Sequence, residues 1–161
     1  MKRFIVPLAV VAVLALLGVW WFSPAQVVKR KTANLLSTLT LDAGTGRVGR
    51  QMATYSLNAL LAEEVRLETP TIKEANGTFA RSELESAFSW LCNQAKETRF
   101  DSQKIHSIEI TGAKAQVELT LFGLVELPTY RPADGIYDVT FYWQKEEDGW
   151  RLTRATWNQV P

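Results

Sequence analysis

The feature that most constrains this 161-residue chain is an apolar run near its N-terminus, from Phe4 to Phe22. An α-helix rises about 1.5 Å per residue, so a helix of about nineteen residues extends over nearly 30 Å. That length matches the hydrocarbon core of a bilayer, roughly 30 Å thick. A core helix of a soluble domain seldom has so long a run without a polar residue. We therefore expect residues 1–22 to form a transmembrane helix and residues 4–22 to contact the membrane lipid bilayer.

A cleaved secretory signal is the alternative interpretation of the same segment. Lys2 and Arg3 form a basic N-terminal region, and residues 23–25 (Ser-Pro-Ala) are of a kind that precedes a signal-peptidase site. Two observations argue against cleavage near Ala25. The run is longer than the apolar region of a signal peptide, which has about 7 to 15 residues. Two adjacent tryptophans near its end are typical of a transmembrane helix at the membrane–water interface. We expect a retained signal-anchor, with secretion after cleavage near Ala25 as the alternative.

The basic residues on the two sides of the run do not decide its orientation. Lys2 and Arg3 precede it and residues 29–31 (Lys-Arg-Lys) follow it, so the positive-inside counts nearly tie. A very short tail before a signal-like segment usually stays in the cytoplasm while the remainder is exported. We therefore expect a single-pass protein whose residues 23–161 lie outside the cytoplasm, in the periplasm.

Charge beyond the anchor argues against a nucleic-acid partner. The chain has 18 Lys and Arg and 17 Asp and Glu. Two of the basic residues precede the apolar run, which leaves 16 basic against 17 acidic residues in the remainder. A near-neutral domain does not attract a polyanion, and residues 29–31 are suited to anionic headgroups instead. Residues 23–161 suffice for one domain with a core.

Hydrophobic periodicity places helices first and strands afterwards, which indicates an α+β fold. Helices are predicted at residues 25–39 and 48–61, with Tyr55 on the apolar side of the second. A third helix begins near Ser82, where Glu85 has capping-box spacing. Strands are predicted at residues 64–68, 105–110, 115–121, 136–145 and 150–157, and we expect Gly123 to bulge the third of them.

Asp148-Gly149 between two alternating apolar runs predicts a closing β-hairpin. With these two residues as the central pair of the turn, Trp143 is opposite Arg154. This register places on the inner face Val139, Phe141, Trp143, Trp150 and Leu152, together with Arg154 and Thr156. Tyr142 and Trp157 then lie on the outer face, where they suit a homodimer contact.

The order helix, helix, short strand, helix and long antiparallel strands resembles the nuclear transport factor 2-like (NTF2-like), or SnoaL-like, cone fold. Four stretches carry the resemblance: residues 57–65, residues 77–91, residues 112–117 and the hairpin with Asp148-Gly149-Trp150-Arg151-Leu152. The resemblance implies about three helices packed on a curved, mostly antiparallel sheet, with a pocket at the open end. The family includes dehydratases, isomerases, cyclases, binding modules and assembly subunits, so the fold alone does not supply the function.

We expect a membrane-anchored, non-catalytic NTF2-like binding or assembly module of the cell envelope. Its partner would be an unknown protein or a small ligand, and a homodimer is possible. The alternative is a small-molecule lyase or isomerase of the SnoaL-like type, which requires an oriented acid and base in the cone. No sequence motif indicates a cofactor, a metal site or a catalytic residue.

Three side chains are candidates for lining a ligand pocket: Tyr55, Trp143 and Arg154. Tyr55 could present a phenol, although an aromatic residue at helical spacing is usually core. Arg154 in an apolar interior could bind an anion, or it could stack on Trp143 with its head in solvent. Cys92, the only cysteine, is predicted to pack as a small hydrophobe, and His106 is predicted to be a surface or structural residue.

Overall fold

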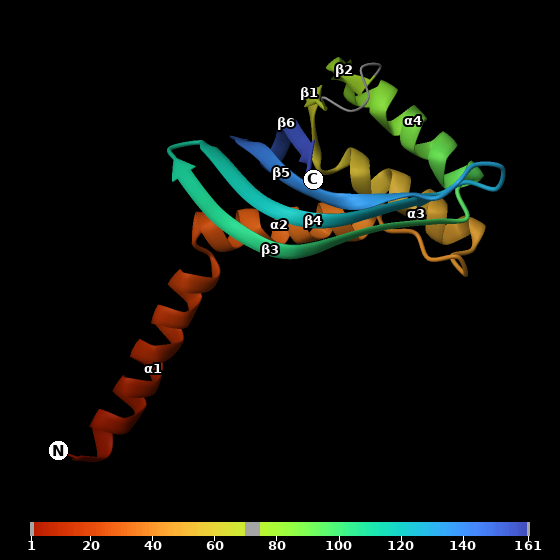
Figure 1. The fold of residues 1–161 in the computed structure, drawn as a ribbon. Helices are drawn as coiled ribbons and strands as arrows, with labels where there is room; N and C mark the ends of the chain where they lie inside the picture. Colours follow the sequence, from red (N-terminus) through yellow and green to blue (C-terminus); the bar gives the residue numbers. More distant parts are fainter. Residues whose placement is uncertain (1, 70–74, 161) are drawn as a thin grey trace.

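The computed structural model describes residues 2–69 and 75–160, with side chains described from residue 10 onward. The elements in chain order are α1 (Lys2–Trp21), α2 (Pro24–Leu39), α3 (Arg47–Asn58), β1 (Leu61–Glu68), β2 (Gly77–Ala80), α4 (Arg81–Gln94), β3 (Glu97–Thr111), β4 (Lys114–Glu126), β5 (Ala133–Glu146) and β6 (Gly149–Gln159). The α+β class is confirmed, with helices packed against one curved sheet (Figure 1).

The six strands form a sheet in the order β2-β1-β6-β5-β4-β3. Neighbours are antiparallel except β1 and β6, which run parallel, so the sheet is mixed. Strand β3 has register shifts at Ser102/Lys104 and Ile105/Ser107, and such bulges increase the twist of a sheet. The long strands accordingly sweep past α2, while α1 extends away from the domain (Figure 1).

The core lies between α2 and the inner face of the sheet. Alternate residues of β4, from Ala115 to Leu121, are buried, as their alternation predicts. Val139, Phe141 and Trp143 continue this face on β5. Helix α2 covers it with the apolar residues Val28, Leu35 and Leu36, all buried.

Helix α3 presents a different side to the core from the one that its sequence suggests. Val48, Met52 and Tyr55 are 74%, 59% and 70% exposed, whereas Leu57 is buried. Apolar residues recur at helical spacing on two sides of this helix, and packing against the domain selects the side of Leu57. The prediction that Tyr55 belongs to an inward apolar stripe is therefore wrong.

The start of α4 also differs from the prediction. The N-cap is Ala80 rather than Ser82, and the Glu83 carboxylate accepts the Ala80 backbone N–H at 2.7 Å. Alanine has no side-chain acceptor, so only half of a capping box exists. Glu85 accepts a 2.7 Å hydrogen bond from the Asn58 amide, which ties α4 to α3.

The register of the closing hairpin corrects the sequence prediction. Glu146 pairs with Gly149 and Trp143 with Leu152, but Tyr142 pairs with Arg154, so Thr153 is an extra residue that forms a β-bulge. Because successive side chains alternate between the two faces of a sheet, the extra residue moves each later residue of β6 to the face opposite the predicted one. Arg154 and Thr156 share the outer face with Tyr142, and Ala155 and Trp157 turn inward.

Helix α4 ends against an arginine that comes from another helix. Arg50 of α3 donates from Nη1 to the carbonyl oxygens of Cys92 and, at 2.7 Å, of Ala95, and from Nη2 to that of Lys96 at 3.2 Å. Helix α4 has no basic residue in its own last turn. The guanidinium therefore satisfies carbonyls that the helix leaves free and complements the negative end of its dipole.

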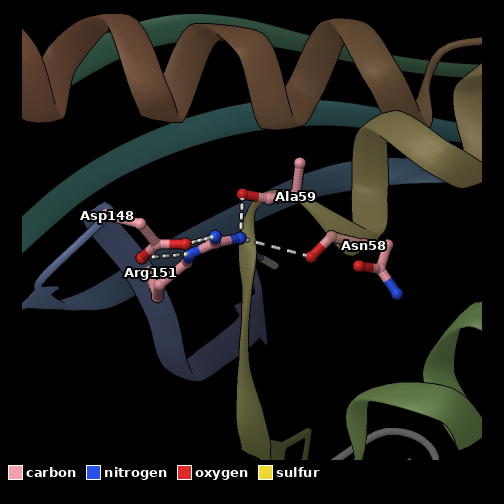
Figure 2. Close-up of polar contacts among 4 residues, drawn as sticks. All are labelled: Asn58, Ala59, Asp148 and Arg151. Carbon is pink, nitrogen blue, oxygen red and sulfur yellow. Dashed lines mark hydrogen bonds and ion pairs between the residues drawn. The ribbon is translucent and has the colours of Figure 1, made fainter.

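Helix α3 ends in the same way, against an arginine of the hairpin (Figure 2). Arg151 of β6 donates from Nη1 to the Ala59 carbonyl oxygen and, at 3.5 Å, to that of Asn58, while its other nitrogens bind the Asp148 carboxylate. The hydrogen bond from Arg151 lowers the pKa of Asp148 below its ordinary value. The hairpin turn is thereby attached to the junction of α3 and β1.

No helix of the described part of the chain has, by itself, the length and apolar character needed to cross a membrane. The segments Val10–Trp21 and Pro24–Leu39 meet these criteria only when taken together, with a bend of 54° between them.

Replacing Arg50 tests the cap of α4. We expect Arg50→Ala to lower the free energy of unfolding by about 2 kcal/mol, because three backbone carbonyls at the end of α4 lose a charged donor. Chemical denaturation of the full chain, followed by circular dichroism, measures the change. Arg47→Ala on the exposed start of the same helix is the matched control, with an expected change within about 0.5 kcal/mol. Equal effects of the two substitutions would contradict the capping role.

Candidate functional site

The first of two apolar cavities lies at the end of the sheet where β4 and β5 are joined. Its volume is about 260 Å³. It is lined by Phe100, Leu121, Gly123, Leu124, Val125, Ala133, Tyr137, Trp157 and Gln159. The polar side-chain groups among these lining residues are the Tyr137 phenol, the Gln159 carboxamide and the Trp157 indole N–H. We call it the mouth cavity, because Ala133 and Gln159 on its border are exposed.

A pair of glycines shapes the mouth cavity. Gly123 of β4 and Gly135 of β5 are directly opposite in the sheet, so the predicted bulge at Gly123 is wrong. A Cβ atom on Gly135 would lie 3.1 Å from the Tyr137 hydroxyl oxygen, and one on Gly123 would lie 3.3 Å from the Tyr137 ring. The absence of both side chains lets the Tyr137 ring lie close against the two strands.

The second cavity, which we call the inner cavity, lies between the sheet and the helices. Its volume is also about 260 Å³. Its lining residues come from α2, α3, α4, β1, β5 and β6: Leu35, Leu39, Leu57, Leu61, Val65, Leu67, Leu84, Ala87, Phe88, Leu91, Phe141, Leu152, Ala155 and Trp157. Each of these side chains is apolar except for the indole nitrogen of Trp157, so no ionisable group is present in this lining.

Trp157 is common to both cavities. It pairs with Val139 across β5 and β6, after the bulge at Thr153 has turned this part of β6 inward. The regular register predicted from the sequence puts Trp157 on the outer face, so its place in the cavities is not predicted. The bulge is the reason, and the alternation of apolar residues on β6 contains no separate signal of it.

The three residues that sequence analysis selects for a pocket do not come together. Tyr55 projects from the outside of α3, 70% exposed. Trp143 is 1% exposed within the core, and its indole N–H has no hydrogen-bond partner among the residues described. Arg154 lies on the outer face of the sheet. None of the three lines the mouth or the inner cavity, and ligand binding by them stays a prediction.

Arg154 has protein partners on the outer face. Its Nη2 lies 2.6 Å from the Glu68 Oε2, and its guanidinium carbon lies 4.9 Å from the centre of the Tyr142 ring. Arg66 binds the other oxygen of Glu68 at 2.6 Å. The hydrogen bond from Arg154 is the largest cause that lowers the pKa of Glu68 below its ordinary value. The interior environment that motivates the anion-pocket hypothesis is thus absent at Arg154, and stacking involves Tyr142 rather than Trp143.

His106 belongs to a hydrogen-bonded row that crosses three strands. Its Nε2 lies 2.7 Å from the Thr120 hydroxyl oxygen, which donates to the Asp138 carboxylate at 2.6 Å. The single hydroxyl proton of Thr120 is donated to Asp138. The proton in the hydrogen bond between His106 and Thr120 must therefore be on Nε2 of His106. An activated nucleophile needs the opposite polarity, with its proton directed to the histidine. His106 and Asp138 are exposed, in agreement with the prediction for His106, and Thr120 is half-buried.

Cys92 is 2% exposed in the packed side of α4, which confirms the prediction of a small buried hydrophobe. Burial raises the pKa of its thiol above the ordinary value. The thiolate is the reactive form of cysteine, so this environment suppresses reactivity.

Labelling with Ellman's reagent tests the state of Cys92. We expect the native full chain at pH 8 to react at least about tenfold more slowly than the same chain in denaturant, because the thiol is buried and protonated. Asn93→Cys in a Cys92→Ala background provides an exposed thiol one residue away as the control. Equally fast labelling of the two thiols in the folded chain would contradict this assignment.

Comparison with known proteins defines the class of fold. No family model matches the chain, and no curated protein matches it. Solved structures do match, and they show that the chain has the NTF2-like fold.

Three of these structures illustrate the likeness. An NTF2-like superfamily protein from Salmonella enterica has 11% identity and a TM-score of 0.66, over 85% of this chain and 91% of that chain. A proposed aromatic ring hydroxylase from Novosphingobium aromaticivorans has 11% identity and a TM-score of 0.68, over 85% and 89%. The S. rosetta CaMKII hub has 14% identity and a TM-score of 0.63, over 86% and 98%. At such identities the likeness concerns the fold alone.

Proposed function

We propose that this protein is a membrane-anchored, non-catalytic NTF2-like binding module that holds an apolar ligand inside the cone. The lining of the two cavities is the observation that carries the proposal. Along the described residues that border them, Tyr137 is the single ionisable side chain. Apolar linings with few polar groups are typical of sites for small apolar ligands.

The runner-up is a lyase or isomerase of the SnoaL-like type. Similar structures include a proposed scytalone dehydratase from Novosphingobium aromaticivorans, with 15% identity. Proton transfer of this kind needs an acid and a base within reach of one substrate. Tyr137 has no second ionisable group beside it in the lining, whereas His106 and Asp138 lie on the exposed row outside the cavities. The binding role therefore has the stronger support.

The anchor proposal is supported by the surface of α1. From Val10 to Phe22 the large apolar side chains of this segment are 52% to 74% exposed, and the helix projects from the domain (Figure 1). Apolar surface exposed on every side of a helix is costly in water and favourable in lipid. Arg30 donates to the Trp21 carbonyl oxygen at 2.9 Å and lies 4.6 Å from the Trp21 ring centre, which caps α1 where lipid headgroups would begin.

Cleavage near Ala25 remains the alternative to a retained anchor. Helix α2 begins at Pro24, and its first buried residue is Val28. A cut near Ala25 would therefore remove none of the buried residues of α2, and the domain is compatible with either outcome. With the anchor retained, residues 23–161 are proposed to lie in the periplasm.

An additional protein partner or a homodimer also belongs to the proposal. Tyr142 is on the outer face of the sheet as expected for such a contact, but Trp157 is not. A sheet-to-sheet contact would therefore rely on the residues around Tyr142, Arg154 and Thr156.

Occupancy of the cone is tested by blocking both cavities. Ala133 and Ala87 are exposed residues on the linings of the mouth and inner cavities, so Ala133→Trp and Ala87→Trp place indoles there with little strain on the core. Full-length protein in nanodiscs is mixed with 1-octanoylglycerol and its bound mass is read by native mass spectrometry. We expect one bound molecule on the native chain and at least a tenfold loss on the double variant, because the apolar volume is filled.

Ala43→Trp, in the exposed connection before α3, is the matched control and should bind like the native chain. Absence of the bound mass from the native chain, or its persistence in the double variant, would contradict a ligand site in the cone.

The anchor is tested by extraction of membranes with alkaline carbonate. We expect the full chain to remain with the membrane and a chain that lacks residues 1–22 to be released, because about nineteen buried apolar residues hold a helix in a bilayer. Mass determination of the membrane-bound protein should give an intact N-terminus. A mature N-terminus near Ala25 together with release of the protein would show a cleaved signal instead.

A further inference from the structure

We infer that the cone takes a single-chain amphiphile with an uncharged head group, and that Trp157 sets the length of the chain that it accepts. This inference rests on the proposed function, because it names the ligand class and a specificity-determining residue of the same site. Three observations carry it: the polarity of the two linings, the position of Trp157 between them and the volume of each cavity.

The linings place the head group at the mouth cavity. Tyr137 and Gln159 offer a hydroxyl and a carboxamide there, and the inner cavity offers only apolar side chains and the Trp157 indole. No Lys, Arg, Asp or Glu is found among the described residues that line either cavity. A charged head would have no counter-charge in the lining, whereas a hydroxyl or ester can bond to the neutral groups. The chain of the amphiphile then points inward.

Trp157 stands where that chain would pass from one cavity to the other. Among the described residues it is the one side chain shared by the two linings, and Ala155 and Leu67 also line the inner cavity. Its position on β6 is fixed by pairing with Val139. On this inference the indole separates the two cavities, so a chain that enters at the mouth cavity ends against it.

The volume of the mouth cavity converts into a chain length. A methylene group is about as large as a water molecule, which takes about 30 Å³ in the liquid. With the head group at the exposed border beside Gln159, a cavity of about 260 Å³ holds about eight or nine such groups. If the indole is removed, we expect the mouth and inner cavities, each about 260 Å³, to join and to accept a chain about twice as long.

The longest chain that the mouth cavity accepts can be measured by letting the cavity and a bilayer compete for the amphiphile. Burial of a methylene group is equally favourable in an apolar cavity and in lipid, so lengthening the chain changes the partition little while the cavity has room. Each methylene beyond the limit stays favourable only in lipid. The bound fraction should then fall by about fourfold per additional methylene.

The experiment uses full-length protein in nanodiscs with an equimolar mixture of 1-monoacylglycerols of six to eighteen chain carbons. Native mass spectrometry identifies the bound chain by its mass. For the native protein we expect bound chains of up to about eight or nine carbons and a steep fall beyond. For Trp157→Ala we expect the bound fraction to decrease only beyond about sixteen carbons or more. Trp90→Ala, which removes a 58% exposed tryptophan from α4, should bind like the native chain.

Trp157→Phe provides a second variant if the alanine variant does not fold, as judged by circular dichroism. Its smaller ring should move the limit by a few carbons in the same direction. If monoacylglycerols bind but native and Trp157 variants show the same distribution, the role of Trp157 is overturned and the proposed binding function stands. If no monoacylglycerol binds to any folded variant, the proposed function itself is overturned.

Discussion

The β-bulge at Thr153 is the feature on which the candidate site depends. One additional residue in β6 sends Arg154 outward to Glu68 and turns Trp157 toward the two cavities. A regular strand would do the reverse, placing a guanidinium in an apolar interior and an indole on the surface. The bulge therefore avoids the cost of an unpaired buried charge and supplies the cone with its central aromatic side chain.

Three helices end at arginines that come from other elements. Arg50 holds the end of α4, Arg151 holds the end of α3 and Arg30 holds the end of α1, each by binding backbone carbonyls. None of these three helices has a basic residue in its own last turn. An arginine from another element then donates to the free carbonyls at the helix end and attaches its own element to that helix. For α3 and α4, which line the inner cavity, these contacts hold the helix ends in place.

Sequence reasoning predicts those features that depend on local periodicity. The alternation in β4, the helix predicted at residues 25–39 and the burial of Cys92 follow from spacing alone. All three are confirmed, the helix beginning one residue earlier, at Pro24. The predictions for Tyr55, Ser82 and Arg154 fail where tertiary packing chooses between two locally equivalent arrangements. The cavities could not be predicted either, because they depend on side chains that are absent at Gly123 and Gly135 and on an indole brought inward by a bulge.

The short connection between α1 and α2 links the proposed anchor to the proposed ligand. Helix α2 begins at Pro24, two residues after Phe22, and enters the core at Val28. A domain attached so closely stays near the lipid surface, where the concentration of any amphiphile that partitions into the bilayer is high. A cone with uncharged, apolar linings gains little from a soluble charged metabolite but is well matched to such a molecule. The proposed anchor and the cavity lining thus favour the same kind of ligand for independent physical reasons.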